Sequence, residues 1–187
     1  MTIRSILELL AQADANLPDN TTGQISPADV RNLIKDFLDT MSPAYGVIQC
    51  SSSVEALTAT AAAISPFTAI LAATAGFFTA NLTAGSVTRE LNGIAGASVR
   101  FTVNGDVAGA NNTAVTVEVY KNGAPTGFRT TVATRGAANP VSFNIAGLTY
   151  NDTNVTYDVR ALTDTNGSYT FSNVVLLCED VPVRSFV

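Results

Sequence analysis

Carboxylate side chains are the groups in this sequence that could carry out chemistry. Two Asp or Glu side chains at a suitable separation are all that a glycosidase needs. Glu118, Asp158 and Arg160 alternate along expected strands, so we expect them to face solvent, opposite a buried face. A carbohydrate-degrading enzyme would instead need two carboxylates in one cleft, about 5 to 10 Å apart. The available carboxylates are Glu118, Asp152, Asp158, Asp164, Glu179 and Asp180.

Other catalytic groups are missing from the sequence. It contains no histidine, which removes the commonest general base, metal ligand and triad member. The distant pair Cys50 and Cys178 cannot form a zinc site, and no glycine-rich phosphate-binding motif is present. We therefore expect no enzymatic activity, no metal site and no cofactor.

Two oxygen-rich segments, Asn151 to Asn154 and Asp164 to Ser168, could be imagined as calcium loops. They lack the EF-hand spacing with its bidentate Glu at position twelve, and their residues are common in turns. Lys121-Asn122-Gly123 predicts a β-hairpin, because Asn-Gly readily adopts positive φ at a two-residue turn. We interpret Asp164 to Ser168 as a second hairpin turn.

Composition indicates a folded protein with a partly covered exterior. The chain has 187 residues, of which 47% are apolar and only 13% charged, about half the usual ~25%. The net charge of −5 and the scattered basic residues argue against nucleic-acid binding. The first residues lack a signal-peptide pattern, so we expect synthesis and assembly in a cytoplasm, with two free thiols.

An uncharged stretch between Glu55 and Arg89 raises the question of a membrane span. It is rich in Ala and Thr, and Pro66 lies in its middle. Proline and β-branched residues fit strands and turns better than a spanning helix. We therefore expect no membrane association.

The first 43 residues predict two amphipathic helices. The first runs from about Thr2 to Ala15, and the second begins at Ser26-Pro27 and ends at Ser42-Pro43. Two short helices cannot form an independent core, so their apolar stripes must be buried against another surface. We predict an anchoring or oligomerisation segment over residues 1–43, whose interface comprises Ile6, Leu10, Val30, Leu33, Ile34, Phe37 and Leu38.

From residue 44 to 187 the pattern changes to period two, which predicts an antiparallel sandwich or barrel. Turn residues bound each alternating segment. Counting three further segments that are less regular, we expect eight or nine strands. The regular segments are 98–103, 114–120, 128–134, 141–147, 154–162 and 169–177, and the others are 67–71, 76–82 and 87–91.

Two parts of the sequence resemble known families. The segment DNTTGQISPADVRNLIKDFLD, ahead of a β domain, resembles the N-terminal part of many tailed-bacteriophage virion proteins, including head fibres, decoration proteins and tail fibres. The run from Phe101 to Glu179, with VEVYKNG, FNIAGLTYNDTNVTYDVRAL and YTFSNVVLLCE, is similar to the trimeric jelly rolls of the tumour-necrosis-factor (TNF) and C1q families.

These resemblances imply a jelly-roll-like sandwich and a structural role in a virion. The expected protein is a homotrimer that decorates or stabilises the phage capsid, as a cement or short head-fibre protein. Its partners would be its own copies and the major capsid protein or an adjacent virion protein. The sequence has no long coiled coil or fibrous repeat, which favours this role over a complete tail fibre.

An alternative role is a tail-fibre or fibre-tip module that binds a host-surface glycan or protein through its loops. The aromatic candidates for such contacts are Tyr150, beside Asn151 and Asp152, and Tyr169, beside Ser168.

Overall fold

The computed structural model describes residues 30, 32–34, 44–90, 98–150 and 154–181. The chain divides into two compact units, Met1–Pro43 and Ala44–Val187, which are considered separately. In the first unit, Val30 and Asn32 to Ile34 are helical. The helix predicted over 2–15 and the rest of the second helix lie outside the described residues.

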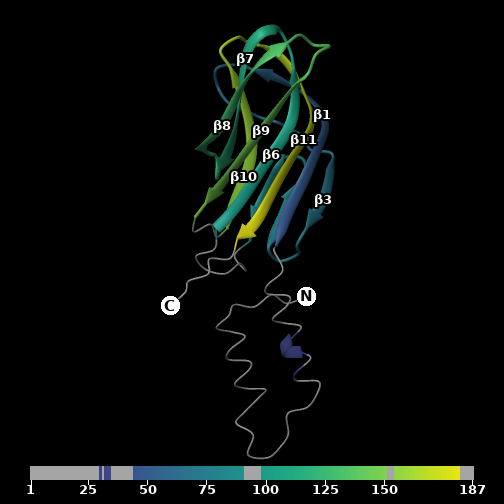
Figure 1. The fold of residues 1–187 in the computed structure, drawn as a ribbon, viewed down its shortest axis with the longest axis vertical. Helices are drawn as coiled ribbons and strands as arrows, with labels where there is room; N and C mark the ends of the chain where they lie inside the picture. Colours follow the sequence, from purple (N-terminus) through teal and green to yellow (C-terminus); the bar gives the residue numbers. More distant parts are fainter. Residues whose placement is uncertain (1–29, 31, 35–43, 91–97, 151–153, 182–187) are drawn as a thin grey trace, which may run out of the picture. The chain divides into compact units, whose positions relative to one another are not determined.

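The second unit is an antiparallel two-sheet sandwich, as the alternating pattern predicted. Sheet A has the strand order β3-β1-β11-β6-β9, and sheet B has the order β4-β5-β10-β7-β8, with β2 added to β10. β3 and β8 lie at opposite sides of the sandwich (Figure 1). The strands are β1 (Tyr45–Leu57), β2 (Ala62–Ala63), β3 (Ala69–Ala73), β4 (Phe78–Asn81), β5 (Ser86–Arg89), β6 (Ser98–Ala108), β7 (Asn111–Lys121), β8 (Ala124–Arg135), β9 (Val141–Thr149), β10 (Val155–Thr163) and β11 (Gly167–Val181).

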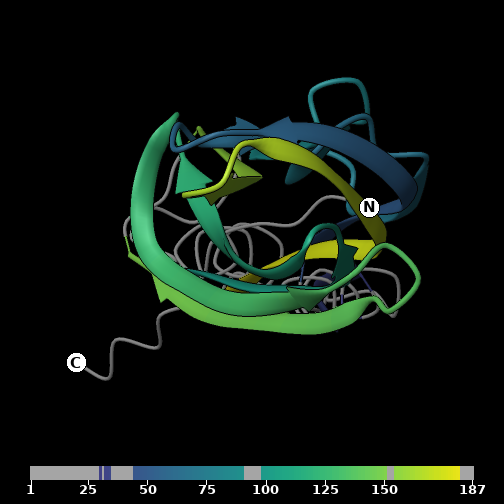
Figure 2. The same cartoon turned by 90° about the horizontal axis from the view of Figure 1, so that it is seen from above.

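The core lies between the two sheets, which Figure 2 shows as two curved layers seen from above. Alternate side chains of each strand point into it, because successive residues of a strand face opposite sides. The ring of Phe101 in sheet A packs against Tyr157 in sheet B, with 6.1 Å between ring centroids. The core also contains fully buried aliphatic residues from both sheets: Ile48, Val99, Val103 and Leu176 from sheet A, and Val87, Val115, Val117 and Val159 from sheet B.

The predicted hairpin at Lys121-Asn122-Gly123 is confirmed. It joins β7 to β8 with Lys121 opposite Ala124, and Asn122 and Gly123 have φ of 50° and 79°. Positive φ at both central residues is the geometry that Asn-Gly favours in a two-residue hairpin. The turn is also tied to β10, because the Asn122 side-chain oxygen accepts a hydrogen bond from the Thr156 amide at 2.9 Å.

The second predicted hairpin, Asp164 to Ser168, is wrong. It follows β10 in sheet B and leads into β11, which pairs with β1 and β6 in sheet A. The segment therefore crosses between the sheets. Turn residues are required at either kind of connection, so their presence does not specify which strands pair.

The described residues contain eleven strands instead of the expected eight or nine. Two strands are missing from the prediction: the two-residue β2, and β1, whose residues Ser51 to Ser53 and Gly46 weaken the apolar alternation. The expected segment 67–71 begins two residues before β3. The uncharged stretch between Glu55 and Arg89 forms strands, and no helix among the described residues is long and apolar enough to cross a membrane.

Candidate interaction surface

The predicted interface residues of the first unit are only partly described. Val30 and Ile34 expose 40% and 53% of their surface, and Leu33 is half-buried. Because residues four apart lie on the same face of a helix, Val30 and Ile34 present one apolar edge. Ile6, Leu10, Phe37 and Leu38 lie outside the described residues.

The outer face of sheet A carries a row without charge across all five strands. Ala72 on β3 lies opposite Val47 on β1, which lies opposite Leu177 on β11. Leu177 in turn faces Thr102 on β6, and Thr102 faces Ala146 on β9. The neighbouring residues of β1 and β11, Ile48 and Leu176, are fully buried in the core, so this row points outward. We call these five residues the sheet A row.

The residues beside the sheet A row are mixed: Arg100 and Glu179 form an ion pair on the same face, and several apolar groups lie next to them. Leu148 and Val175 on the same face are half-buried, and Tyr45 is exposed. At the edge of the sheet, Ile70 and Leu71 of β3 are exposed as well. Edge strands of soluble proteins are commonly protected by charged residues or proline, but β3 reads AILAA. The face and its edge therefore have the character of a surface that a partner covers.

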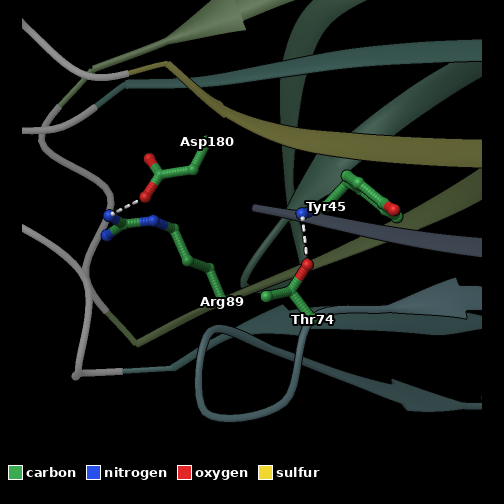
Figure 3. A network of polar contacts seen from close by, with 4 residues as sticks. All are labelled: Tyr45, Thr74, Arg89 and Asp180. Carbon is green, nitrogen blue, oxygen red and sulfur yellow. Dashed lines mark hydrogen bonds and ion pairs between the residues drawn. The ribbon is translucent and has the colours of Figure 1, made fainter. Parts of the chain in front are cut away.

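A buried ion pair joins the two sheets close to the start of the domain (Figure 3). Arg89, the last residue of β5, donates from Nη2 to Oδ2 of Asp180 on β11 at 2.9 Å. Their side chains are 0% and 7% exposed. The backbone amide of Asp180 also donates to the carbonyl of Ala44 at 2.7 Å, which ties the first residue of the domain to β11.

Beside this ion pair, Thr74 fastens the exposed Tyr45 to the β3 edge. The Thr74 amide donates to the Tyr45 carbonyl at 2.8 Å, and the Tyr45 amide donates to Oγ1 of Thr74 at 3.1 Å (Figure 3). The ion pair could not be predicted from the sequence, because Arg89 and Asp180 are 91 residues apart and a single Arg has no characteristic spacing.

The expectation that Glu118 and Asp158 face solvent is wrong. Both point outward from sheet B, yet only 5% of Glu118 and 8% of Asp158 is exposed. A bulge in β8 covers Glu118, whose Oε1 accepts a hydrogen bond from the Gly127 amide at 2.9 Å. Asp158 accepts one from Nε of Arg160 at 2.6 Å, and the half-buried Arg160 lies over the Tyr120 ring, 4.4 Å from its centroid.

The charged residues Glu118, Asp158 and Arg160 on this face take part in contacts within the protein. Glu118 binds the bulge of β8 through Gly127, and Asp158 binds Arg160 where it lies over Tyr120 of β7. No group of three or more metal-binding side chains occurs among the described residues. Cys50 and Cys178 are buried free thiols. Burial raises the pKa of the Cys50 thiol, because the thiolate would lose its hydration.

The two aromatic candidates for ligand contacts differ. Tyr150 is strongly exposed, whereas Tyr169 is buried and its hydroxyl donates to the Thr165 carbonyl at 3.0 Å. Tyr169 is therefore a core residue, and Asn151 and Asp152 lie outside the described part of the chain.

Comparisons with known proteins relate this chain to others by fold. No family model and no curated protein sequence matches it. A crystal structure of murine APRIL at pH 8.5 matches with a TM-score of 0.53 and 7% identity, covering 75% of this chain and all of APRIL. The globular domain of zebrafish complement 1qA protein matches with a TM-score of 0.47 and 8% identity, covering 75% of this chain and 97% of the zebrafish chain. The β domain thus has a TNF-like jelly-roll fold, and at this identity the likeness is one of fold alone.

Proposed function

We propose that this chain is a non-enzymatic structural protein of a phage virion, a homotrimer that decorates and stabilises the capsid. The first unit attaches it to the major capsid protein or to an adjacent virion protein. The virion role rests on the resemblance of residues 19–39 to the N-terminal parts of phage virion proteins. The trimer rests on the TNF-like fold, which resembles trimeric jelly rolls, and on the sheet A row.

The sheet A row is the observation that carries the trimer. Strands of a solvent-exposed sheet normally alternate apolar residues, which face the core, with polar residues, which face the solvent. The sheet A row instead presents Ala, Val, Leu, Thr and Ala on its outer face. A stable interface buries about 800 Å² per partner, which is comparable to much of one face of a five-stranded sheet. Covering the row would also account for the low charge content of the chain.

Trimerisation would strengthen attachment to a shell. Each anchor contributes an apolar edge such as Val30 and Ile34, and three joined anchors bind with avidity well above that of one. A protein that binds only the assembled lattice stabilises that lattice by mass action.

The trimer is tested with a matched pair of substitutions. Leu177 on sheet A and Leu162 on sheet B are both half-buried leucines on outer sheet faces. Analytical ultracentrifugation should find a trimer for the wild type and for Leu162→Glu, and a monomer for Leu177→Glu. A monomeric wild type, or a trimeric Leu177→Glu protein that is normally folded by circular dichroism, would contradict the proposed interface.

The virion role is tested by cryo-electron microscopy of intact particles. We expect trimeric density on the capsid surface, and its loss when Ile34→Asp replaces the wild-type protein. Normal amounts of the Ile34→Asp protein in purified virions would refute the anchor.

The alternative role, a fibre-tip module that binds a host-surface receptor, is favoured by the strongly exposed Tyr150. Density confined to the tail or fibre tips would support it over decoration.

A further inference from the structure

The outer face of sheet B presents its charges unevenly. Its two carboxylates, Glu118 and Asp158, are buried and already accept hydrogen bonds from Gly127 and Arg160. Arg129 and Arg135 on β8 are exposed. Solvent on this side of β8 therefore meets guanidinium groups, although the chain as a whole has a net charge of −5.

The two exposed arginines belong to the same face of β8. The neighbours of Arg129 and Arg135 along the strand, Phe128 and Thr134, point inward: Phe128 packs edge-on against Phe101 at 5.2 Å, and Thr134 is fully buried. Side chains of a strand alternate, so Arg129 and Arg135 both point outward. Neither guanidinium makes a hydrogen bond or ion pair with the described residues.

Small side chains form the surface between the two arginines. Thr131 and Ala133 of β8 lie there, opposite Thr116 and Ala114 of β7. Arg129 and Arg135 are six positions apart, a distance of about 20 Å along an extended strand. The arginine face consists of Arg129, Thr131, Ala133 and Arg135 of β8 together with Ala114 and Thr116 of β7. It has a cation at each end and methyl and hydroxyl groups between them.

We propose that the arginine face binds an acidic polysaccharide whose carboxylates pair with Arg129 and Arg135. The planar guanidinium fork matches a carboxylate and can bind it with two parallel hydrogen bonds. A sugar ring has an apolar face and hydroxyl groups at its rim, which suit the alanines and threonines between the arginines. The site has too few cations for nucleic acid, which relies on many phosphate contacts.

Charge on an edge strand also has a simpler explanation. β8 is the edge of sheet B, and charged residues on edge strands prevent two sheets from pairing. Under that explanation any cation would serve, whereas recognition of carboxylates by paired hydrogen bonds needs arginine. Substitution of the arginines by lysine therefore distinguishes protection of the edge strand from recognition of carboxylates.

The test measures binding of the purified full-length chain to immobilised polygalacturonate, alginate and polysialic acid by biolayer interferometry, with neutral dextran as the uncharged polymer. We expect binding to at least one acidic polymer and none to dextran. Arg129→Gln and Arg135→Gln should each weaken that binding about three- to tenfold. The matched control is Arg100→Gln, which removes an exposed cation from sheet A and should leave binding within twofold.

The double variant Arg129→Lys/Arg135→Lys should also bind more weakly, although its net charge is unchanged. Absence of binding to all three acidic polymers would overturn the proposal. So would equal binding to polyglutamate, which would indicate an acidic protein as the partner, and so would full binding by the lysine variant. These assays use the isolated protein, so their outcome is independent of any attachment to a capsid.

Discussion

The buried pair between Arg89 and Asp180 allows a quantitative test of what holds the two sheets together. Removing one member of a buried ion pair costs about 3–5 kcal/mol, because the other charge stays buried without it. Replacing both with apolar residues of similar volume is often neutral or stabilising. We therefore expect Asp180→Leu and Arg89→Met each to destabilise the protein by about 3–5 kcal/mol, and the double variant to lie within about 1 kcal/mol of the wild type.

Urea unfolding followed by far-ultraviolet circular dichroism measures this effect. With a slope of about 2 kcal/mol per molar urea, a loss of 4 kcal/mol lowers the unfolding midpoint by about 2 M. The neighbouring residue provides the control: Glu179 points to the opposite face of β11 and contacts the exposed Arg100 at 3.4 Å. Removing such a surface pair by Glu179→Leu should cost about 0–1 kcal/mol.

The reasoning would be refuted if Asp180→Leu and Glu179→Leu lowered the midpoint equally. It would also be refuted if the double variant were as unstable as the sum of its single variants, because additivity would show that Arg89 and Asp180 do not interact.

Three further predictions concern individual residues of the β domain. Glu118→Ala should destabilise by about 1–3 kcal/mol, because the hydrogen bond from the Gly127 amide to the largely buried Glu118 carboxylate is lost, whereas Glu118→Gln keeps an acceptor oxygen and should cost less in the same urea titration. Gly147→Ala should destabilise the protein by about 1–3 kcal/mol, because the new methyl group would lie 2.3 Å from the Phe101 ring. The control is Gly167→Ala, whose methyl group would meet no atom closer than 3.4 Å. Equal thermal midpoints for the two variants would contradict the packing argument. Cys50 should react with a disulfide reagent far more slowly in the native protein than in urea. Because its pKa is raised, the rate in the native protein should keep rising with pH where an exposed thiol is already ionised. Equal rates in the native and unfolded protein would show that the thiol is accessible.

The sequence predicted the features of this fold that depend on local pattern. Period-two alternation located β6 to β11, because each strand has one face in the core, and Asn122-Gly123 specified its own turn. β1 was missed because its partner β11 stabilises it from far along the chain, while its own residues include three consecutive serines. Strand pairing across such distances leaves no trace in local composition.

The candidate sites depended more strongly on tertiary structure. Alternation correctly placed Glu118 on the outer side of β7, but a bulge in β8 then covered it. In the same way, Arg89 and Asp180 are polar residues that the sandwich buries at its end. The sheet A row becomes visible only when five strands are aligned in register, because each strand contributes a single residue to it.

The central position of β11 has a consequence for the order in which the domain can form. β11 lies between β1 and β6, so Tyr45 finds its partner Glu179 only after nearly the whole domain has left the ribosome. Until then β1 and β6 have unpaired edges, and non-local pairing of this kind is slow and exposes the chain to aggregation. Sheet A, including the sheet A row on its outer face, is therefore completed only after β11 has been synthesised, and the association that we propose for this face has to wait until then.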